Sequence, residues 1–182
     1  MALIILAHPN YETSFANKTI IDELQKSNLD LEIRNIHNLY PDYQIDVKVE
    51  QEALLRHQNI VFQFPLHWYN VPAILKHYYD EVFAYQFSHG PEGDKVKGKN
   101  FILSFTAGTP EDSYSKTGYQ RFEMQEYFRN LEQLAHYAQM TYIDPISIYA
   151  ASLFVGTTQE ELTIKSKDHA SRLLKKISEL EN

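Results

Sequence analysis

The sequence predicts a three-layer doubly wound α/β fold, in which helices cover both faces of five parallel strands. Short and largely apolar runs at 2–7, 59–64 and 101–105 have the composition of central parallel strands that are buried on both faces. Segments with apolar residues at helical spacing separate them, as right-handed crossovers require. A chain of 182 residues with 43% hydrophobic content fits one domain, which we expect to span 1–182.

Each expected element has its own signal. The strands are expected at 2–7, 29–36, 59–64, 100–106 and 141–149. The helices are expected at 15–26, 46–57, 74–83, 124–138 and from 158 to about 180. Ser14 is placed to cap the first helix, and residues 29–36 alternate only loosely, which is typical of a more exposed strand. Pro72 stands where the first turn of a helix tolerates proline.

The second half of the chain carries equally local signals. Residues 86–99 hold three glycines and no apolar period, which predicts a surface loop. Apolar residues from Met124 to Ala138 repeat at helical spacing and predict one long amphipathic helix. Asp144 and Pro145 interrupt the fifth strand, which favours an edge position with a distortion. Thr158 and Glu161 form a capping box at the start of the last helix.

Strand order 2-1-3-4-5 is the arrangement we expect for this alternation. It places the carboxyl ends of the first and third strands beside each other, at the point where the order reverses. Loop 8–17 and loop 65–69 should therefore meet. Open α/β sheets bind their ligands in this crevice, and the stretch 65–83 carries the only tryptophan of the chain.

Several classes of protein are excluded by what the sequence lacks. It contains no cysteine, so disulfides, thiolate metal sites and cysteine nucleophiles are absent, and redox chemistry requires a cofactor. The first glycine is Gly90, which rules out a glycine-rich dinucleotide turn or a Walker loop after the first strand. The net charge of -7 and the lack of a basic block argue against nucleic acid. The eight histidines match no metal-ligand spacing.

The loop after the first strand can hold a phosphate without glycine. Thr13 and Ser14 supply hydroxyls, the start of the helix supplies free N–H groups, and His8 could add a donor. For Ser14 alone, the favoured interpretation is an ordinary helix cap. For His8 alone, it is a loop histidine whose hydrogen bonds are made within the protein. A helix terminus contributes only about 0.3 to 2 kcal/mol to anion binding, whereas micromolar affinity needs about 8 kcal/mol.

A large flat group would supply the missing affinity. It would pack against Trp68 and accept hydrogen bonds from the loops after the third and fourth strands, which is what an isoalloxazine ring demands. For Trp68 alone, core packing and a ligand role are balanced alternatives. The complementary loops indicate a flavin pocket, with phosphate held by Ser14 to Asn17.

Several motifs together resemble the flavodoxin-like NAD(P)H:quinone oxidoreductases, a family that includes DT-diaphorase, modulator of drug activity B and the ancillary flavoproteins of glutathione-regulated potassium-efflux systems. The likeness spans nearly the whole chain and is strongest to the ancillary flavoproteins. Its motifs are His8-Pro9 with Ser14-Phe15-Ala16-Asn17, Pro65-Leu66-His67-Trp68-Tyr69 with Val71-Pro72-Ala73, Lys97-Gly98-Lys99, Thr106-Ala107-Gly108, and Leu39-Tyr40-Pro41-Asp42.

The resemblance implies FMN or FAD as prosthetic group, NAD(P)H as co-substrate, a quinone-like acceptor reduced by two-electron ping-pong transfer, and a homodimer that completes the sites. It assigns the cofactor to three groups of residues, namely His8 with Ser14, Phe15, Ala16 and Asn17; Pro65, Leu66, His67, Trp68 and Tyr69; and Thr106, Ala107, Gly108 and Thr109. Ala107-Gly108 replaces the glycine pair usual in the family. Tyr114 and Tyr119 are the candidates to support charge on the reduced flavin.

Two other functions stay open on the sequence. One is a regulatory flavoprotein that docks on a membrane potassium-efflux antiporter, and the other is a flavodoxin-type electron shuttle. We expect a cytoplasmic protein, because no apolar run approaches the length of a membrane span and the amino terminus lacks the pattern of a secretory signal. The regulatory function would place it at the inner face of the cell membrane.

Overall fold

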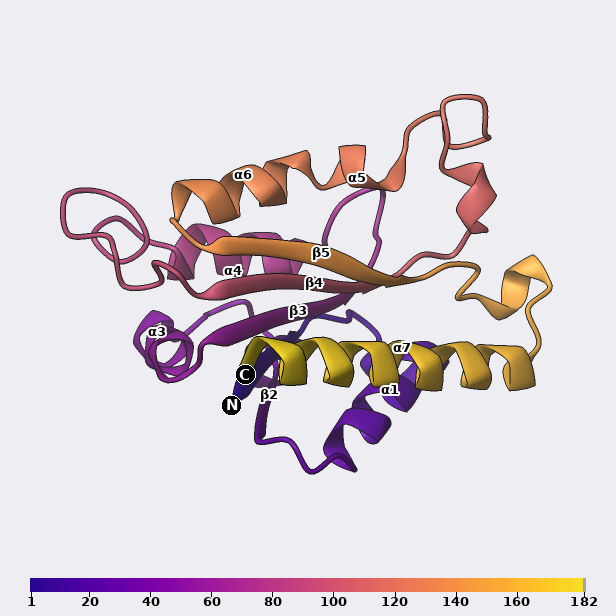
Figure 1. Cartoon of the computed structure of the whole chain (residues 1–182), viewed down its shortest axis with the longest axis horizontal. Helices are drawn as coiled ribbons and strands as arrows, with labels where there is room; N and C mark the ends of the chain where they lie inside the picture. Colours follow the sequence, from indigo (N-terminus) through magenta and orange to yellow (C-terminus); the bar gives the residue numbers. More distant parts are fainter. Residues whose placement is uncertain (182) are drawn as a thin grey trace.

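The computed structural model describes residues 1–181 and shows a five-stranded sheet between two layers of helices (Figure 1). All neighbouring strands are parallel and follow the order β2-β1-β3-β4-β5, which confirms the architecture expected from the sequence. The strands are β1 (Ala2–Leu6), β2 (Leu31–Asn35), β3 (Asn59–Pro65), β4 (Asn100–Thr106) and β5 (Thr141–Ile148). The α-helices are α1 (Phe15–Gln25), α2 (Ile36–Leu39), α3 (Val47–Arg56), α4 (Ala73–Val82), α5 (Met124–Tyr127), α6 (Arg129–Tyr137) and α7 (Gln159–Glu181). Short 3-10 turns are η1 (Tyr11–Thr13), η2 (Glu111–Ser113) and η3 (Leu153–Val155).

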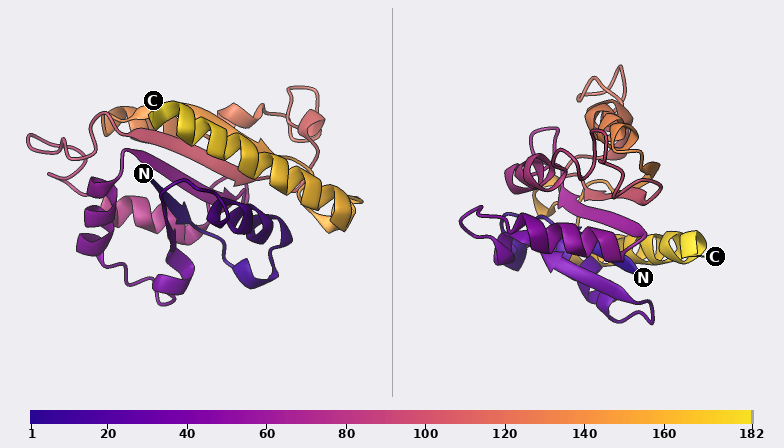
Figure 2. Two further views of the ribbon diagram at one scale, coloured as in Figure 1. Left: turned by 60° about the horizontal axis from the view of Figure 1, so that its bottom comes forward. Right: turned by 90° about the vertical axis from the view of Figure 1, so that its left-hand side faces the viewer.

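The two faces of the sheet carry different helices. Helices α1 and α7 lie side by side on one face, here called the α7 face, and α3, α4, α5 and α6 cover the other, called the α4 face (Figures 1 and 2). Alternate residues of each strand point to opposite faces. In β4, Phe101 and Leu103 join the core of the α4 face, whereas Ile102 joins that of the α7 face. Both cores are buried, as the continuous apolar runs predicted.

Most local signals in the sequence have the expected structural outcome. Ser14 caps α1 as expected. Asp46, expected as the first residue of the next helix, is instead the cap of α3, and its carboxylate accepts from the Val49 N–H at 3.1 Å. Thr158 and Glu161 form the capping box before α7, and β2 is only half-buried throughout. The register between β4 and β5 shifts between Ile102 and Ser104, opposite the Asp144-Pro145 interruption. Pro72 differs slightly, because it caps α4 with an extended ψ of 150° instead of lying within the first turn.

The helix expected over 124–138 is interrupted. The backbone leaves the helical conformation at Phe128, with φ −107° and ψ 10°, so this residue ends α5 and begins α6. Its buried ring lies 4.8 Å from the ring of Phe105 and 6.0 Å from that of Phe64. The interruption of the helix lets the Phe128 ring pack against both of these strand residues. Aromatic packing on the sheet therefore overrides the helical period of the sequence.

A buried carboxylate joins the edge strand to the helices of the α4 face. Glu50 of α3 is fully buried and accepts from the Arg34 guanidinium at 2.6 Å. Two hydroxyls also donate to this carboxylate, from Tyr40 at 2.6 Å and from Tyr78 at 3.3 Å. A buried charge is tolerated only when it is paired and its lone pairs are satisfied, and both conditions hold for Glu50.

Substitution Arg34→Met tests this cluster. Removing the cation leaves the Glu50 carboxylate buried without its charge partner, so we expect the free energy of unfolding to fall by about 3 kcal/mol. The control Arg129→Met breaks the exposed pair with Glu132 and should cost less than about 0.5 kcal/mol. Denaturant titration measures both variants, and equal stabilities of the two would contradict a structural role for Arg34.

Candidate functional site

The carboxyl ends of the central strands open into a cavity of about 590 Å³. It lies where the strand order reverses, at the end of the sheet towards which the arrows of β3 and β4 point in Figure 1. Loop 8–17 and loop 65–69 meet here, as the strand order required. The structure gathers ten of the predicted residues around the cavity, namely His8, Ser14, Phe15, Ala16, Asn17, Pro65, Leu66, His67, Thr106 and Gly108.

The start of α1 forms a polar wall of the cavity. Ser14 is the N-cap, and its hydroxyl oxygen accepts from the Asn17 N–H at 3.4 Å and from the Asn17 side-chain amide at 3.1 Å. The N–H groups of Phe15 and Ala16 lie in the first turn, where helical N–H groups have no partner within the helix. These donors and the positive end of the helix dipole make the wall suited to an anion.

His8 lies at the end of β1, close to two other histidines. Its Nδ1 accepts from the Asn10 N–H at 3.1 Å, which leaves the ring proton on Nε2. Burial, followed by the nearby His67 and His37, lowers the pKa of His8 to about 4. His8 is therefore a neutral hydrogen-bond donor at pH 7 and brings no positive charge to the cavity.

The loop after β3 divides its residues between the cavity and the surface. The Leu66 N–H donates to the Thr106 carbonyl at 2.8 Å, which ties this loop to the end of β4. His67 and Asn70 exchange two backbone hydrogen bonds across a tight turn, at 2.8 and 2.9 Å. Trp68 in the middle of the turn has a φ of 45° and is 92% exposed, so it lies outside the cavity lining.

Tyr69 follows Trp68 with a φ of 64° and also lies outside the lining. Its ring stacks on that of Tyr127, with centroids 5.2 Å apart. Positive φ at two adjacent non-glycine residues costs conformational free energy, and such backbone strain is characteristic of binding loops. The turn thus presents Trp68 and Tyr69 beside the cavity and not within it.

The loop after β4 is held by β5. The Ala107 N–H donates to the Ile148 carbonyl at 2.8 Å, so this fully buried residue has no free donor for a ligand, whereas Gly108 is exposed and lines the cavity. Thr109 lies beyond it, and its hydroxyl is 2.7 Å from that of Tyr114. Burial raises the pKa of Tyr114, which keeps the phenol protonated.

Tyr119 is 87% exposed and lies apart from this pair. The next residue, Gln120, instead donates from its side-chain amide to the Thr109 hydroxyl at 3.3 Å. Gln120 was not among the predicted residues. A polar turn gives no local signal for which of its side chains folds back, and only the tertiary structure distinguishes these neighbours.

The loop after β5 completes the cavity and was missed at the level of sequence. Its contributing residues, with one from the first turn of α7, are Ala151, Ser152, Leu153, Phe154 and Leu162. The available signal was topological, because β5 ends at the same edge of the sheet as β3 and β4.

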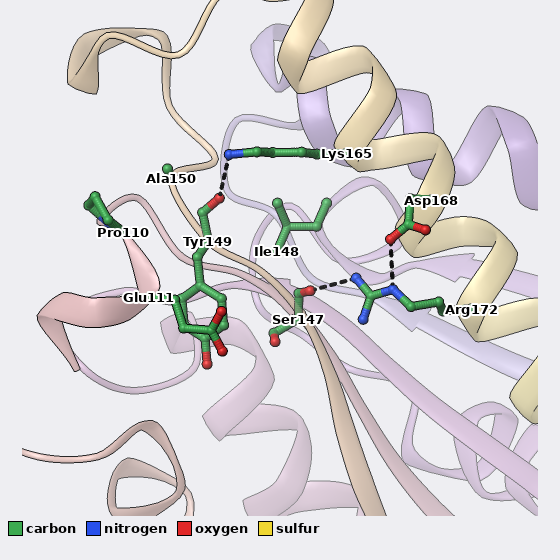
Figure 3. Close-up of a pocket in the computed structure, with 9 residues that line it drawn as sticks. All are labelled: Pro110, Glu111, Ser147, Ile148, Tyr149, Ala150, Lys165, Asp168 and Arg172. Atoms are coloured by element: carbon green, nitrogen blue, oxygen red, sulfur yellow. Dashed lines mark hydrogen bonds and ion pairs between the residues drawn. The ribbon is translucent and has the colours of Figure 1, made fainter. Parts of the chain in front are cut away.

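A smaller cavity of about 320 Å³ lies between η2, β5 and α7 (Figure 3). Its two cations are committed to protein acceptors. Arg172 binds the Asp168 carboxylate at 2.8 Å and the Ser147 carbonyl at 2.9 Å, and the Lys165 ammonium faces the Tyr149 carbonyl at 3.5 Å. Across residues 1–181 no group of three or more His, Cys, Asp or Glu side chains is placed to hold a metal ion.

Comparison with known proteins identifies the family. The model of the flavodoxin-like fold family matches residues 1–174, and the chain belongs to this family. It is 37% identical over 179 residues to the uncharacterized NAD(P)H oxidoreductase YdeQ of Bacillus subtilis (strain 168), a match that covers 98% of this chain and 87% of that protein. These matches confirm the fold family and support the oxidoreductase class expected from the sequence.

Two further proteins are similar over most of the chain. The glutathione-regulated potassium-efflux system ancillary protein KefG of Yersinia enterocolitica is 38% identical over 152 residues, which cover 82% of this chain and 80% of KefG. The crystal structure of general stress protein 14 from Treponema denticola, in complex with FMN, superposes with a TM-score of 0.86 at 30% identity and covers 94% of this chain and 97% of that one.

In the described part of this chain, no helix has both the length and the apolar character that crossing a membrane requires.

The lowered pKa of His8 predicts acid sensitivity. An unfolded histidine has a pKa of about 6.5, so between pH 6.5 and 4 the unfolded chain binds more protons at this residue than the folded chain. The unfolding free energy should therefore fall as the pH is lowered through this window, and His8→Gln should make the fall less steep. Denaturant titrations at several pH values measure the slope. The exposed His136→Gln serves as control, and identical slopes for the two variants would contradict this assignment.

Proposed function

We propose that the chain is an FMN-dependent NAD(P)H oxidoreductase that reduces quinones or similar planar acceptors. The observation that carries this proposal is the cavity itself, which lies at the point of strand reversal. Its lining combines a helix start that has free N–H groups with residues of the loop after β3. Its volume of about 590 Å³ lies within the range of cofactor pockets. The similarity to an FMN-bound stress protein and to a named NAD(P)H oxidoreductase supports the same function.

The donor set fits the phosphate end of FMN. The Ser14 hydroxyl and the N–H groups of Phe15 and Ala16 converge at the positive end of α1, and neutral His8 adds an Nε2–H donor. Hydrogen bonds to a charged group contribute about 1.5 to 3 kcal/mol each. Together they provide the affinity that a helix dipole alone lacks.

The loops after β3 and β4 fit the ring end. Leu66 supplies apolar contact, and exposed Gly108 lets the chain approach a flat ring closely. The Leu66–Thr106 backbone bond holds the two loops at a fixed separation. We place Trp68 at the border of the ring site, where it would cover the ring or the acceptor.

Bound FMN would supply the redox chemistry, taking a hydride from NAD(P)H and passing two electrons to the acceptor in a ping-pong cycle. The chain's own contribution is orientation and electrostatics. Tyr114 keeps its proton and can donate through its hydroxyl, which accepts from the Thr109 hydroxyl. Gln120 in turn donates to the Thr109 hydroxyl. Tyr114 is therefore our candidate to stabilise negative charge on the reduced flavin ring. Tyr119 would have to rotate from its exposed position to do the same.

A second copy of the chain forms part of this proposal. Trp68, Tyr119 and Phe122 are exposed aromatic residues on the loops that follow β3 and β4. A homodimer would cover them and narrow the acceptor site, and light scattering of the purified chain tests this association.

We propose that the protein acts in the cytoplasm.

The test of the cofactor is direct. Purified protein should bind FMN, and anaerobic NADH or NADPH should bleach the visible absorption of the bound flavin. A spectrum unchanged by either nicotinamide would overturn the enzymatic function and favour an electron shuttle. Steady-state turnover with a quinone should give the parallel double-reciprocal lines of a ping-pong cycle.

Ser14→Ala should weaken FMN binding by about tenfold, because one hydrogen bond to a charged phosphate is lost. Riboflavin, which lacks the phosphate, should bind both proteins with similar affinity. Ser27→Ala is the matched control, because Ser27 follows the opposite end of α1 and its hydroxyl donates to the Leu24 carbonyl. Fluorescence titration measures the affinities of the wild type and of both variants for FMN and riboflavin. An equal loss for both flavins in Ser14→Ala would contradict a phosphate contact by Ser14.

A regulatory function on a potassium-efflux system is the second candidate, favoured by the 38% identity to KefG. A tagged chain incubated with membrane vesicles that carry such a system should then be retained on the vesicles. Brisk quinone turnover without retention on these membranes would argue against the regulatory function.

A further inference from the structure

Two polar residues interrupt the buried layer on the α7 face of the sheet. Gln63 of β3 and Ser104 of β4 are neighbours in register, and both are fully buried. Val61 and Ile102, which lie two positions earlier on the same face, belong to the apolar core of this face. Buried polar groups are destabilising unless they are hydrogen-bonded, so the partners of Gln63 and Ser104 are informative.

These partners form a continuous chain of hydrogen bonds from α7 to the cavity. His169 Nε2 lies 2.7 Å from Ser104 Oγ, and Ser104 Oγ lies 2.6 Å from Gln63 Oε1. Gln63 Nε2 then donates to Asn17 Oδ1 at 2.8 Å. We call His169, Ser104, Gln63 and Asn17 the buried polar chain, and all four residues are at most 1% exposed.

The buried polar chain ends on two hydroxyls that line the cavity. The Asn17 side-chain amide donates to Ser14 Oγ at 3.1 Å and to Thr106 Oγ1 at 3.4 Å. Both hydroxyl oxygens act as acceptors in these bonds. Their own protons therefore remain available for a ligand in the cavity.

The direction of the bonds follows from Ser104. Its hydroxyl has one proton, which it donates to Gln63 Oε1, so it can only accept from His169. The opposite direction would turn both amides around and make Ser14 and Thr106 donate to Asn17. Their protons would then point away from the cavity.

The environment of His169 favours the first direction. Burial, and then the nearby Arg172, lower the pKa of His169 to about 4, against smaller opposing effects of the Ser147 backbone and Asp168, so the ring is neutral and has one proton. The Ser147 carbonyl near the ring is already bound by Arg172, and within residues 1–181 no hydrogen bond of normal geometry reaches His169 Nδ1 (Figure 3). A buried N–H without a partner is rarer than an unpaired acceptor, which places the proton on Nε2.

We propose that the buried polar chain sets the Ser14 and Thr106 hydroxyls as donors towards a phosphate, with His169 as its positioning residue. The inference rests on the proposed function, because the phosphate is that of FMN. It adds a second layer of residues behind the cavity lining, which runs along the α7 face of the sheet to the C-terminal helix. Preorganised donors bind an anion better than hydroxyls that must first reorient.

The test compares FMN with riboflavin on the full-length chain after removal of any bound flavin. His169→Leu removes the Nε2 donor, and the preference for FMN over riboflavin should fall by about tenfold. His169→Gln can present a side-chain N–H at a similar position and should restore most of the preference. A purely structural role would weaken the binding of both flavins together, and an unchanged ratio in His169→Leu would overturn the inference.

A second pair of variants leaves His169 in place. Ser104→Ala breaks the buried polar chain and should lower the FMN preference as His169→Leu does. Ser166→Ala is its matched control, because Ser166 is an equally buried serine of α7 whose hydroxyl makes no hydrogen bond within the described chain. Equal ratios for these two variants would also overturn the inference.

The tautomer of His169 separates this inference from the proposed function. The ¹⁵N shifts of the His169 ring in the labelled chain should show the proton on Nε2, and a proton on Nδ1 would overturn the direction of the chain. Wild-type protein that binds neither flavin would instead overturn the proposed function, and the phosphate role of His169 with it. Wild-type protein that prefers FMN, together with variants of unchanged preference, contradicts the positioning role alone.

Discussion

The buried side chain of Asn17 is the point on which the site depends. It belongs to the first turn of α1, yet its oxygen is bound by Gln63 of β3 and its amide reaches Thr106 of β4. A helix start at the surface normally frays, and here it is joined to the centre of the sheet. The free N–H groups of Phe15 and Ala16 are therefore held in a fixed position relative to the loops after β3 and β4.

The fold was predictable because its signals are local and agree with one another. The central strands are short apolar runs, and Ser14 and Thr158 cap the helices that follow them. The strand order then brings the loops after the first and third strands together. Phe128 shows where this reasoning ends. Its position fits the helical period, but packing against Phe64 and Phe105 decides its backbone conformation, and that contact is not local in the sequence.

The sequence predicted which loops border the candidate site, but it predicted only some of the side chains that line the cavity. The only tryptophan of the chain lies in a loop and was expected to form a wall of the ligand site, but the His67–Asn70 turn directs Trp68 to the surface. Gln120 and the loop after β5 gave no pattern that distinguishes them from other polar turns. Gln63 and Ser104 did give a signal, because a polar residue inside a buried strand needs a partner, but only the structure shows that the partners are Asn17 and His169.

The absence of cysteine and the neutrality of His8 and His169 define how this protein can act. His8 and His169 each have a pKa lowered to about 4, so neither provides charge or a readily exchanged proton near pH 7. They instead fix the direction of the hydrogen bonds around them, because a neutral imidazole donates from one nitrogen and accepts at the other. His8 accepts from the Asn10 N–H and His169 donates to Ser104, and in each case the ring has one defined orientation. A site built from such groups stabilises charge that a bound cofactor develops, and it does so without reorganising during the reaction.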